Sequence, residues 1–330
     1  MSLFRLTSPN IKVRRLGYFV LLTKILSQYR SLLKPSLIRE FEKLSVDYID
    51  FFRSYPYKSK GETCIKPSNK HDGAKRYIRT AEELGLVAKL ANEYHITKLG
   101  DIVASLPDEK SPFILSLSQR CFFLKLLLKK DRDTLIPIIK LMEANSDISS
   151  KLEFFKEYVA KKGGSLKWEK NPKKYYNESI ESPRIGWLKD LKVVSLNGEL
   201  DKKFISFFSD DFFKKDPDLT NIYYQEFCKA NEELKNVRRL ADLPLEEKRN
   251  WLNKYLNKCY KLFKLPGVWR ISASQFLEYS TCVMLCRDKV LSSFSSLEKA
   301  FVELFDYNRF PFKLRKISGK EDIGFIVRIQ

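Results

Sequence analysis

The sequence predicts a mainly α-helical protein with small β-hairpins, in which a helix that leads directly into a hairpin occurs more than once. Apolar residues recur at helical spacing along most of the chain, and short runs of β-forming residues flank polar turns at three places. A hydrophobic fraction of 44% and an aromatic fraction of 13% are sufficient for packed cores. Because 330 residues are too many for a single small core, we expect several domains.

Three helical segments open the chain. In residues 15–29 apolar side chains recur every three or four positions, as on one face of an amphipathic helix. Pro35 and Ser36 mark the start of a second helix, because proline is tolerated in a first helical turn. Residues 46–55 form a third helical segment and lead into a loop.

A basic helix followed by a hairpin closes this part of the chain. Gly85 follows the last apolar position of a helix that begins with a cluster of Lys and Arg. Glycine is common just past a helix, because it adopts positive φ without a steric penalty. Residues 86–90 and 94–97 are two β-capable runs joined by a short polar turn, which predicts a hairpin. We expect residues 1–107 to form one module.

The net charge of +20 is the strongest global signal. Such a field favours acidic partners, of which nucleic acid is the commonest. Residues 1–100 carry 19 basic and 9 acidic side chains, a net charge of +10, and residues 53–79 alone carry eight basic against two acidic. This clustering favours a binding face over the alternative, a generally charged surface.

Residues 108–215 are predicted to form a second module of similar plan. Its first half is helical by apolar spacing, at residues 111–130, 131–143 and 148–162. A Lys-rich loop follows, which contains Trp168, Tyr175 and Tyr176. These rings could stack on unpaired bases, or they could attach the loop to the module.

The end of the second module repeats the end of the first. Ser182 and Pro183 start a short helix, and Asn197-Gly198 is the strongest short hairpin signal. Placing Leu191-Lys192-Val193-Val194 on Leu84-Gly85-Leu86-Val87 gives an offset of 107, which also places Ile185 on Ile78 and Asp190 on Glu83. We interpret the two passages as tandem modules.

Residues 216–330 are predicted to form a third module with the same order of parts. Long helices are expected at residues 219–240, 244–265 and 272–290, with a fourth to residue 306 and a C-terminal hairpin at residues 312–329. The fourth helix carries a mixed, partly acidic set of side chains, which suits a protein partner better than a phosphate-lined groove. These are Glu298, Lys299, Glu303 and Asp306.

The first module resembles a winged helix-turn-helix. The residues that carry the resemblance are YIRTAEELGLVAKLANEYHITKLG, a basic helix followed by Leu-Gly-Leu-Val and a hairpin. With the second passage, SPRIGWLKDLKVVSLNGEL, the layout resembles the DNA-recognition region of FokI-type restriction endonucleases. The resemblance implies a sequence-recognising protein that binds double-stranded DNA, as the recognition component of a restriction, defence or regulatory system.

In that family the helix before the wing enters the major groove, and the hairpin touches the backbone. The resemblance therefore implies contacts by Lys75, Arg76 and Arg79 and, in the second copy, by Arg184, Lys189 and Lys192. The second copy departs from the first, because Pro183 and Gly186 stand at the positions of Arg76 and Arg79.

We assign two roles to the candidate contact residues. Arg76 and Arg79 are the best base readers, because a guanidinium can pair with both acceptors of guanine in the major groove. Lysines would hold phosphates, which fixes the register without reading sequence. The predicted phosphate contacts are Lys58, Lys60, Lys66, Lys70, Lys75, Lys173 and Lys174.

Two alternatives remain open. A protein-interaction scaffold is favoured by the mixed fourth helix of the third module and by Phe204, Phe207, Phe208, Phe212 and Phe213. A metal-dependent nuclease needs two carboxylates and a lysine, and the nearest matches are Asp190 with Asp201-Lys202-Lys203, and Glu246-Glu247-Lys248. The chain lacks the glycine-rich and nucleophile motifs of other enzyme classes. We do not expect an enzyme.

The cysteines and histidines predict no metal site and no cofactor. The six cysteines contain no C-x-x-C pair, so we interpret them as reduced thiols of a cytoplasmic protein. Cys282 and Cys286 share one helix face, but with only two histidines, His71 and His95, a standard zinc site lacks ligands. The apolar start of the chain is interrupted by Thr23 and Lys24, so we expect a core helix rather than an export signal or membrane span.

Overall fold

The computed structural model describes residues 13–54, 64–144, 147–161, 171–201, 231–234, 236–264, 267–305, 310–317 and 320–329. These residues are mainly helical with small sheets, as the sequence predicts. They fall into two compact units. Unit 1 contains the described residues of Met1–Ala104, Asp108–Ser116 and Phe123–Tyr224, and unit 2 those of Ser105–Pro107, Leu117–Phe122 and Gln225–Gln330. The three modules stay a prediction.

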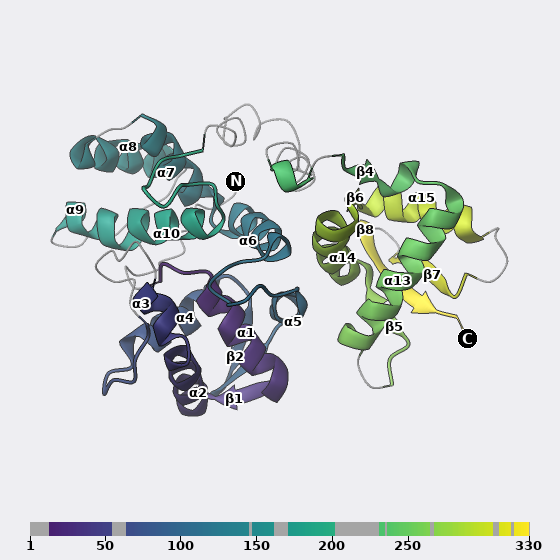
Figure 1. Cartoon of the computed structure of the whole chain (residues 1–330), viewed down its shortest axis with the longest axis horizontal. Coiled ribbons are helices and arrows are strands. Elements are labelled where there is room, and N and C mark those ends of the chain that lie inside the picture. Colours follow the sequence, from purple (N-terminus) through teal and green to yellow (C-terminus); the bar gives the residue numbers. More distant parts are fainter. Residues whose placement is uncertain are drawn as a thin grey trace. The chain divides into compact units, whose positions relative to one another are not determined.

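The first half of unit 1 is a group of helices with a three-stranded antiparallel sheet (Figure 1). The sheet has the order β1-β3-β2, so the hairpin strand β3 lies between its partner β2 and the distant β1. The elements in chain order are α1(Gly17–Tyr29), β1(Ser31–Leu33), α2(Lys34–Val46), α3(Ile49–Ser54), α4(Asp72–Glu83), β2(Val87–Leu90), β3(Glu93–Ile96) and α5(Lys98–Ser105). The helices and the hairpin confirm the prediction, and β1 was not predicted.

Aromatic packing holds α1 in the centre of this group. The Tyr18 ring stacks on Phe52 at a centroid distance of 5.8 Å and meets the edge of Phe41 at the same distance. The hairpin is joined to α5 by a close backbone approach at Gly100, where a Cβ would lie 2.2 Å from the carbonyl oxygen of Leu86. Only glycine fits there, and the hairpin therefore has a fixed position on the helices.

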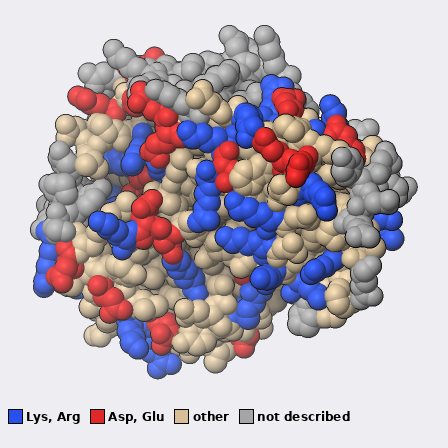
Figure 2. All heavy atoms as spheres, turned by 45° about the vertical axis from the view of Figure 1, so that its right-hand side comes forward, with Lys and Arg blue, Asp and Glu red and all other residues tan. Residues whose placement is uncertain are grey.

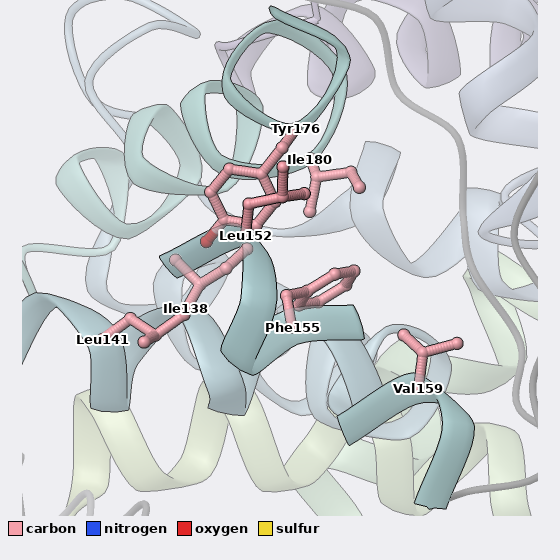
Figure 3. Close-up of a cluster of buried hydrophobic side chains, with 7 residues drawn as sticks. All are labelled: Ile138, Leu141, Leu152, Phe155, Val159, Tyr176 and Ile180. Carbon is pink, nitrogen blue, oxygen red and sulfur yellow. The ribbon is translucent and has the colours of Figure 1, made fainter. Parts of the chain in front are cut away.

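The second half of unit 1 is helical. Its elements are α6(Leu117–Lys130), of which Leu117–Phe122 belong to unit 2, α7(Arg132–Glu143), α8(Ile148–Lys161), α9(Pro172–Tyr175), a π-helical segment η1(Tyr176–Glu181) and α10(Ser182–Asp190). Side chains from α7, α8 and η1 form a buried cluster (Figure 3). The predicted second hairpin is reduced, among the described residues, to a single bridge between Val194 and Leu200 around the Asn197-Gly198 turn.

Asp190 joins the two halves of unit 1. Its carboxylate accepts hydrogen bonds from Arg15 Nε at 2.8 Å and from the Leu16 amide, just before α1, at 2.7 Å. A carboxylate at a helix N-terminus is favoured by the helix dipole. Close by, a Cβ at Gly186 would lie 2.4 Å from the Arg14 carbonyl oxygen, so α10 packs directly on the chain that enters α1.

The two passages aligned at an offset of 107 end their helices in the same way. The residue at the turn has positive φ in both, 78° at Gly85 and 58° at Lys192. Each turn makes the paired backbone bonds of a Schellman C-cap, in which the second amide after the cap returns to the last helical turn. The bonds are Gly85 N to Glu82 O (2.9 Å), Leu86 N to Ala81 O (2.8 Å), Lys192 N to Lys189 O (3.0 Å) and Val193 N to Leu188 O (3.0 Å).

This geometry gives opposite expectations for two substitutions. Lys192→Gly should stabilise the protein by about 0.5–1 kcal/mol, because glycine adopts positive φ without a Cβ penalty. Gly85→Ala should destabilise it by roughly 1–2 kcal/mol for the same reason. Thermal unfolding of both variants, with Lys192→Arg as the matched control, measures the effect. A destabilised Lys192→Gly variant would contradict this account of the turn.

Unit 2 has the same sheet order as the start of unit 1 and a similar succession of elements. The elements are η3(Glu232–Leu234), β4(Arg238–Arg239), η4(Leu240–Asp242), α13(Leu245–Phe263), β5(Arg270–Ser272), α14(Ala273–Asp288), β6(Val290–Leu291), α15(Phe294–Phe305), β7(Phe312–Ile317) and β8(Lys320–Arg328). In both units a helix is followed by a short strand, further helices come next, and a two-stranded hairpin comes last. The intervening elements differ, because unit 1 has α2, α3 and α4 there and unit 2 has α14, β6 and α15. The sheet order β5-β8-β7 corresponds to β1-β3-β2.

Most of the predicted elements of this region are present in unit 2. The helices predicted at residues 244–265 and 272–290, the fourth helix and the C-terminal hairpin are confirmed. The prediction of a helix to residue 240 is wrong at its described end, where two 3-10 turns flank strand β4, which pairs with β6. Residues 219–230 lie outside the described part of the chain.

Candidate nucleic-acid interface

Helix α4 separates its apolar and basic side chains onto different faces. Its buried residues recur at helical spacing and pack into unit 1; they are Ala74, Tyr77, Ile78, Thr80 and Ala81. On the other side Lys75 and Arg79 are exposed, and Arg76 is half-buried. Residues three and four apart are neighbours on a helix surface. The three predicted contact residues of this helix therefore lie together on its outer face, which we call the α4 surface.

Two of these cations make weak contacts within the unit. Arg79 Nε lies 3.2 Å from Glu83 Oε1, but the arginine side chain is 74% exposed, and such surface ion pairs stabilise a fold by only about 0–1 kcal/mol. Lys75 Nζ donates to the carbonyl oxygen of Lys70 at 2.8 Å. Neither contact buries the charge, so both cations can exchange these partners for a ligand.

The β2–β3 hairpin is fixed to the end of α4. Thr97 Oγ1 lies 2.7 Å from the Gly85 carbonyl oxygen and 2.9 Å from that of Leu86. The hairpin projects Lys89 into solvent, and Leu90 is 61% exposed. Lys89 was missed from the sequence because it stands alone, outside any cluster of cations.

The chain before α4 adds further cations, with one residue turned inward. Lys66 and Lys70 are exposed, and the predicted contacts Lys58 and Lys60 lie outside the described residues. His71 Nδ1 lies 2.8 Å from Glu42 Oε2, whose side chain is only 3% exposed. The His71 side chain is therefore held by the buried carboxylate of Glu42 and does not project freely into solvent.

Arg184 of the second copy is buried. Its guanidinium donates from Nε and Nη2 to the two carboxylate oxygens of Asp131 at 2.7 and 2.8 Å, and both side chains are 0% exposed. A group in that position cannot reach a phosphate, so this prediction does not fit the structure. Lys192 is exposed at the turn after α10, and Lys189 is half-buried.

The Lys-rich segment before α10 also contains both exposed and buried residues among those predicted to bind nucleic acid. Lys173 and Lys174 are exposed on α9. Tyr176, in contrast, is buried, with its ring edge against Phe155 at a centroid distance of 5.5 Å and its hydroxyl among apolar side chains (Figure 3). Burial raises the pKa of Tyr176 well above its usual value. Of the two readings, attachment to the module is correct for Tyr176, and Trp168 lies outside the described residues.

The residues considered for a nuclease serve the fold. Asp190 holds the start of α1, as shown above, and Lys248 Nζ lies 2.6 Å from Glu303 Oε2. Glu247 pairs with Arg238 at 3.0 Å. Over the described ranges no group of three His, Cys, Asp or Glu side chains has the geometry to hold a metal ion.

The paired cysteines of α14 face different neighbours. Cys282 is buried, whereas Cys286 Sγ lies 3.8 Å from Cys121 Sγ.

The acidic residues of α15 form ion pairs within unit 2. Glu298 pairs with Lys316 of β7, next to a groove of about 370 Å³ between α15 and β7. The protein partner of the third module stays a prediction.

No protein-family model matches this chain, and neither a curated protein nor a solved structure is significantly similar to it. None of the described helices combines the length and the hydropathy that crossing a bilayer requires.

Proposed function

We propose that the protein binds double-stranded DNA, and that the first half of unit 1 is a winged-helix module whose α4 reads the major groove. The observation that carries this proposal is the α4 surface, on which Lys75, Arg76 and Arg79 lie together directly before the hairpin. The order of helices and strands, with the sheet order β1-β3-β2, supports the module type. The corresponding sheet order in unit 2 and the matching ends of α4 and α10 support tandem modules.

The roles of the α4 residues follow from their chemistry. A guanidinium paired with both acceptors of guanine discriminates against a wrong base by about 1–3 kcal/mol, which exceeds the value of the exposed pair between Arg79 and Glu83. Arg79 therefore gains by leaving Glu83 for a base. The exposed lysines hold phosphates on either side and set the register; those described are Lys66, Lys70, Lys75, Lys173 and Lys174.

A salt titration tests this function. Binding of the protein to a pool of random duplex, followed by fluorescence anisotropy, should weaken steeply as salt is added, because each phosphate contact releases counterions. Five such contacts correspond to a slope of about −4 to −5 in log affinity against log salt. Affinity that does not change with salt would reject DNA binding by these residues. Selection of bound sequences from the same pool then tests sequence recognition.

A further inference from the structure

Helix α13 of unit 2 exposes a row of lysines that sequence reasoning did not single out. Lys254, Lys258 and Lys261 stand at positions i, i+4 and i+7, which places them on one side of the helix. Lys254 and Lys261 are exposed, and Lys258 is half-buried. Figure 2, in which the right-hand side of Figure 1 comes forward, shows many Lys and Arg side chains on the face in view, with Asp and Glu between them.

A fourth cation, Arg287, lies in the last turn of α14, which packs against α13. Burial lowers the pKa of Lys258, and the nearby charges of Arg287 and Lys254 lower it further. Among the described carboxylates, only Asp288 lies within ion-pair distance of any of these four cations, at 3.5 Å from Lys254 Nζ. Most of the positive charge is therefore left without an internal counterion in the described part of the chain.

Aromatic rings hold the ammonium groups in place without neutralising them. Lys254 Nζ lies 4.5 Å from the centroid of the Trp251 ring and 5.0 Å from that of Tyr255, and Lys258 Nζ lies 5.7 Å from Tyr279. Such cation–π contacts are worth about 0.5–1 kcal/mol at exposed sites. They keep the charge but restrict where it lies, as a binding surface requires.

An exposed aromatic residue lies near the C-terminal end of α13, where the Tyr260 hydroxyl donates to the carbonyl oxygen of Trp269 at 3.0 Å. Trp269 is 53% exposed, and Lys264 Nζ lies 3.9 Å from its ring centroid. An exposed indole beside a cation offers a stacking partner for a base.

We propose that the row formed by Lys254, Lys258, Lys261 and Arg287, the α13 surface, binds the phosphodiester backbone of nucleic acid. Along the helix axis Lys254 and Lys258 are separated by a rise of about 6 Å, and Lys258 and Lys261 by about 4.5 Å. Both values lie between the rise of one nucleotide of a strand, about 3.4 Å, and that of two, about 7 Å. Charges placed one after another along a line suit a polymer of phosphates better than a single anion. The inference extends the proposed function to a second surface, but it rests on no residue of α4.

Charge reversal in the full-length chain tests this proposal. The variant K254E/K258E/K261E is compared with R239E/K299E/R315E, which changes the net charge equally at exposed positions elsewhere in unit 2. Anisotropy with fluorescein-labelled single-stranded and duplex oligonucleotides is the measurement. The α13 variant should bind at least about tenfold more weakly than wild type at moderate salt, and its salt slope should fall by about 3. The salt slope of the control variant should be closer to that of wild type than the slope of the α13 variant is. Comparison of the single-stranded and duplex oligonucleotides shows which form of nucleic acid this surface prefers.

Three further measurements keep the outcomes separate. Repeating the titration in the α4 variant K75E/R76E/R79E distinguishes failure of the α13 surface from failure of the proposed function. If charge reversal disturbs folding, the milder variant K258Q/K261Q replaces it in the titration. This variant should bind the oligonucleotides a few-fold more weakly than wild type. Equal weakening in the α13 variant and its control overturns the proposal. The proposal is also overturned if the α13 variant loses binding to phosphatidylserine vesicles but keeps wild-type affinity for both oligonucleotides, because the surface then binds membrane lipids.

Discussion

Reversing the charge of the α4 surface, with K75E/R76E/R79E, should lower duplex affinity about 100-fold or more. Each lost bidentate contact to a base removes about 1–3 kcal/mol, and each reversed charge adds repulsion from the phosphates. The three side chains project away from the core-facing residues of α4, so the fold should be retained. Anisotropy with the duplex pool and circular dichroism measure the two effects.

A matched control separates position from net charge. K43E/K110E/K161E reverses three exposed lysines on other elements and should weaken binding only a few-fold. A second variant, R76K/R79K, keeps the charge but removes the planar fork of the guanidinium. It should retain affinity for random duplex while losing preference for the selected sequence. Unchanged duplex binding by the charge-reversed α4 variant would eliminate this surface as the binding site.

Asp131→Ala should destabilise unit 1 by about 3–5 kcal/mol, because it leaves the guanidinium of Arg184 charged and buried without its partner. The pair is bidentate and fully enclosed, so the variant leaves the guanidinium out of contact with bulk solvent. For a unit of this size the loss corresponds to a fall in melting temperature of roughly 10 °C, which differential scanning calorimetry measures.

The double variant D131L/R184M is the informative comparison. Replacing a buried ion pair by apolar residues of similar volume is often neutral or stabilising, so the double variant should be more stable than Asp131→Ala alone. A loss of less than about 1 kcal/mol in Asp131→Ala would show that Arg184 is accommodated in some other way. Neither variant should change duplex affinity once folded, since both residues lie away from solvent.

Much of the fold could be predicted because its signals are local. Apolar spacing over 15–29 and the glycine at position 85 specify α1 and the end of α4 within a few residues. The strands β1 and β5 could not be predicted in this way. Each has three residues, and each pairs with a strand more than fifty positions later, as in Leu32 opposite Tyr94. Such pairing is decided by the assembled helices rather than by the strand's own sequence.

The same limit applies to the candidate site. Lys75, Arg76 and Arg79 could be placed on an outer face because the apolar residues of α4 define the inner one. Arg184 occurs in an equally basic stretch, but its environment is set by Asp131, 53 positions earlier in the chain. The α13 surface was missed for a related reason, since Arg287 joins the three lysines only through the packing of α14 beside α13.

The central position of β3 has a consequence for affinity. Since β3 pairs with both β1 and β2, the hairpin is bound on one side to the strand that leads into α2 and on the other to the turn that ends α4. Helix and hairpin thus form one preorganised body. A duplex that touches both meets cations already in place, so little conformational entropy is lost on association and more of the contact energy appears as binding.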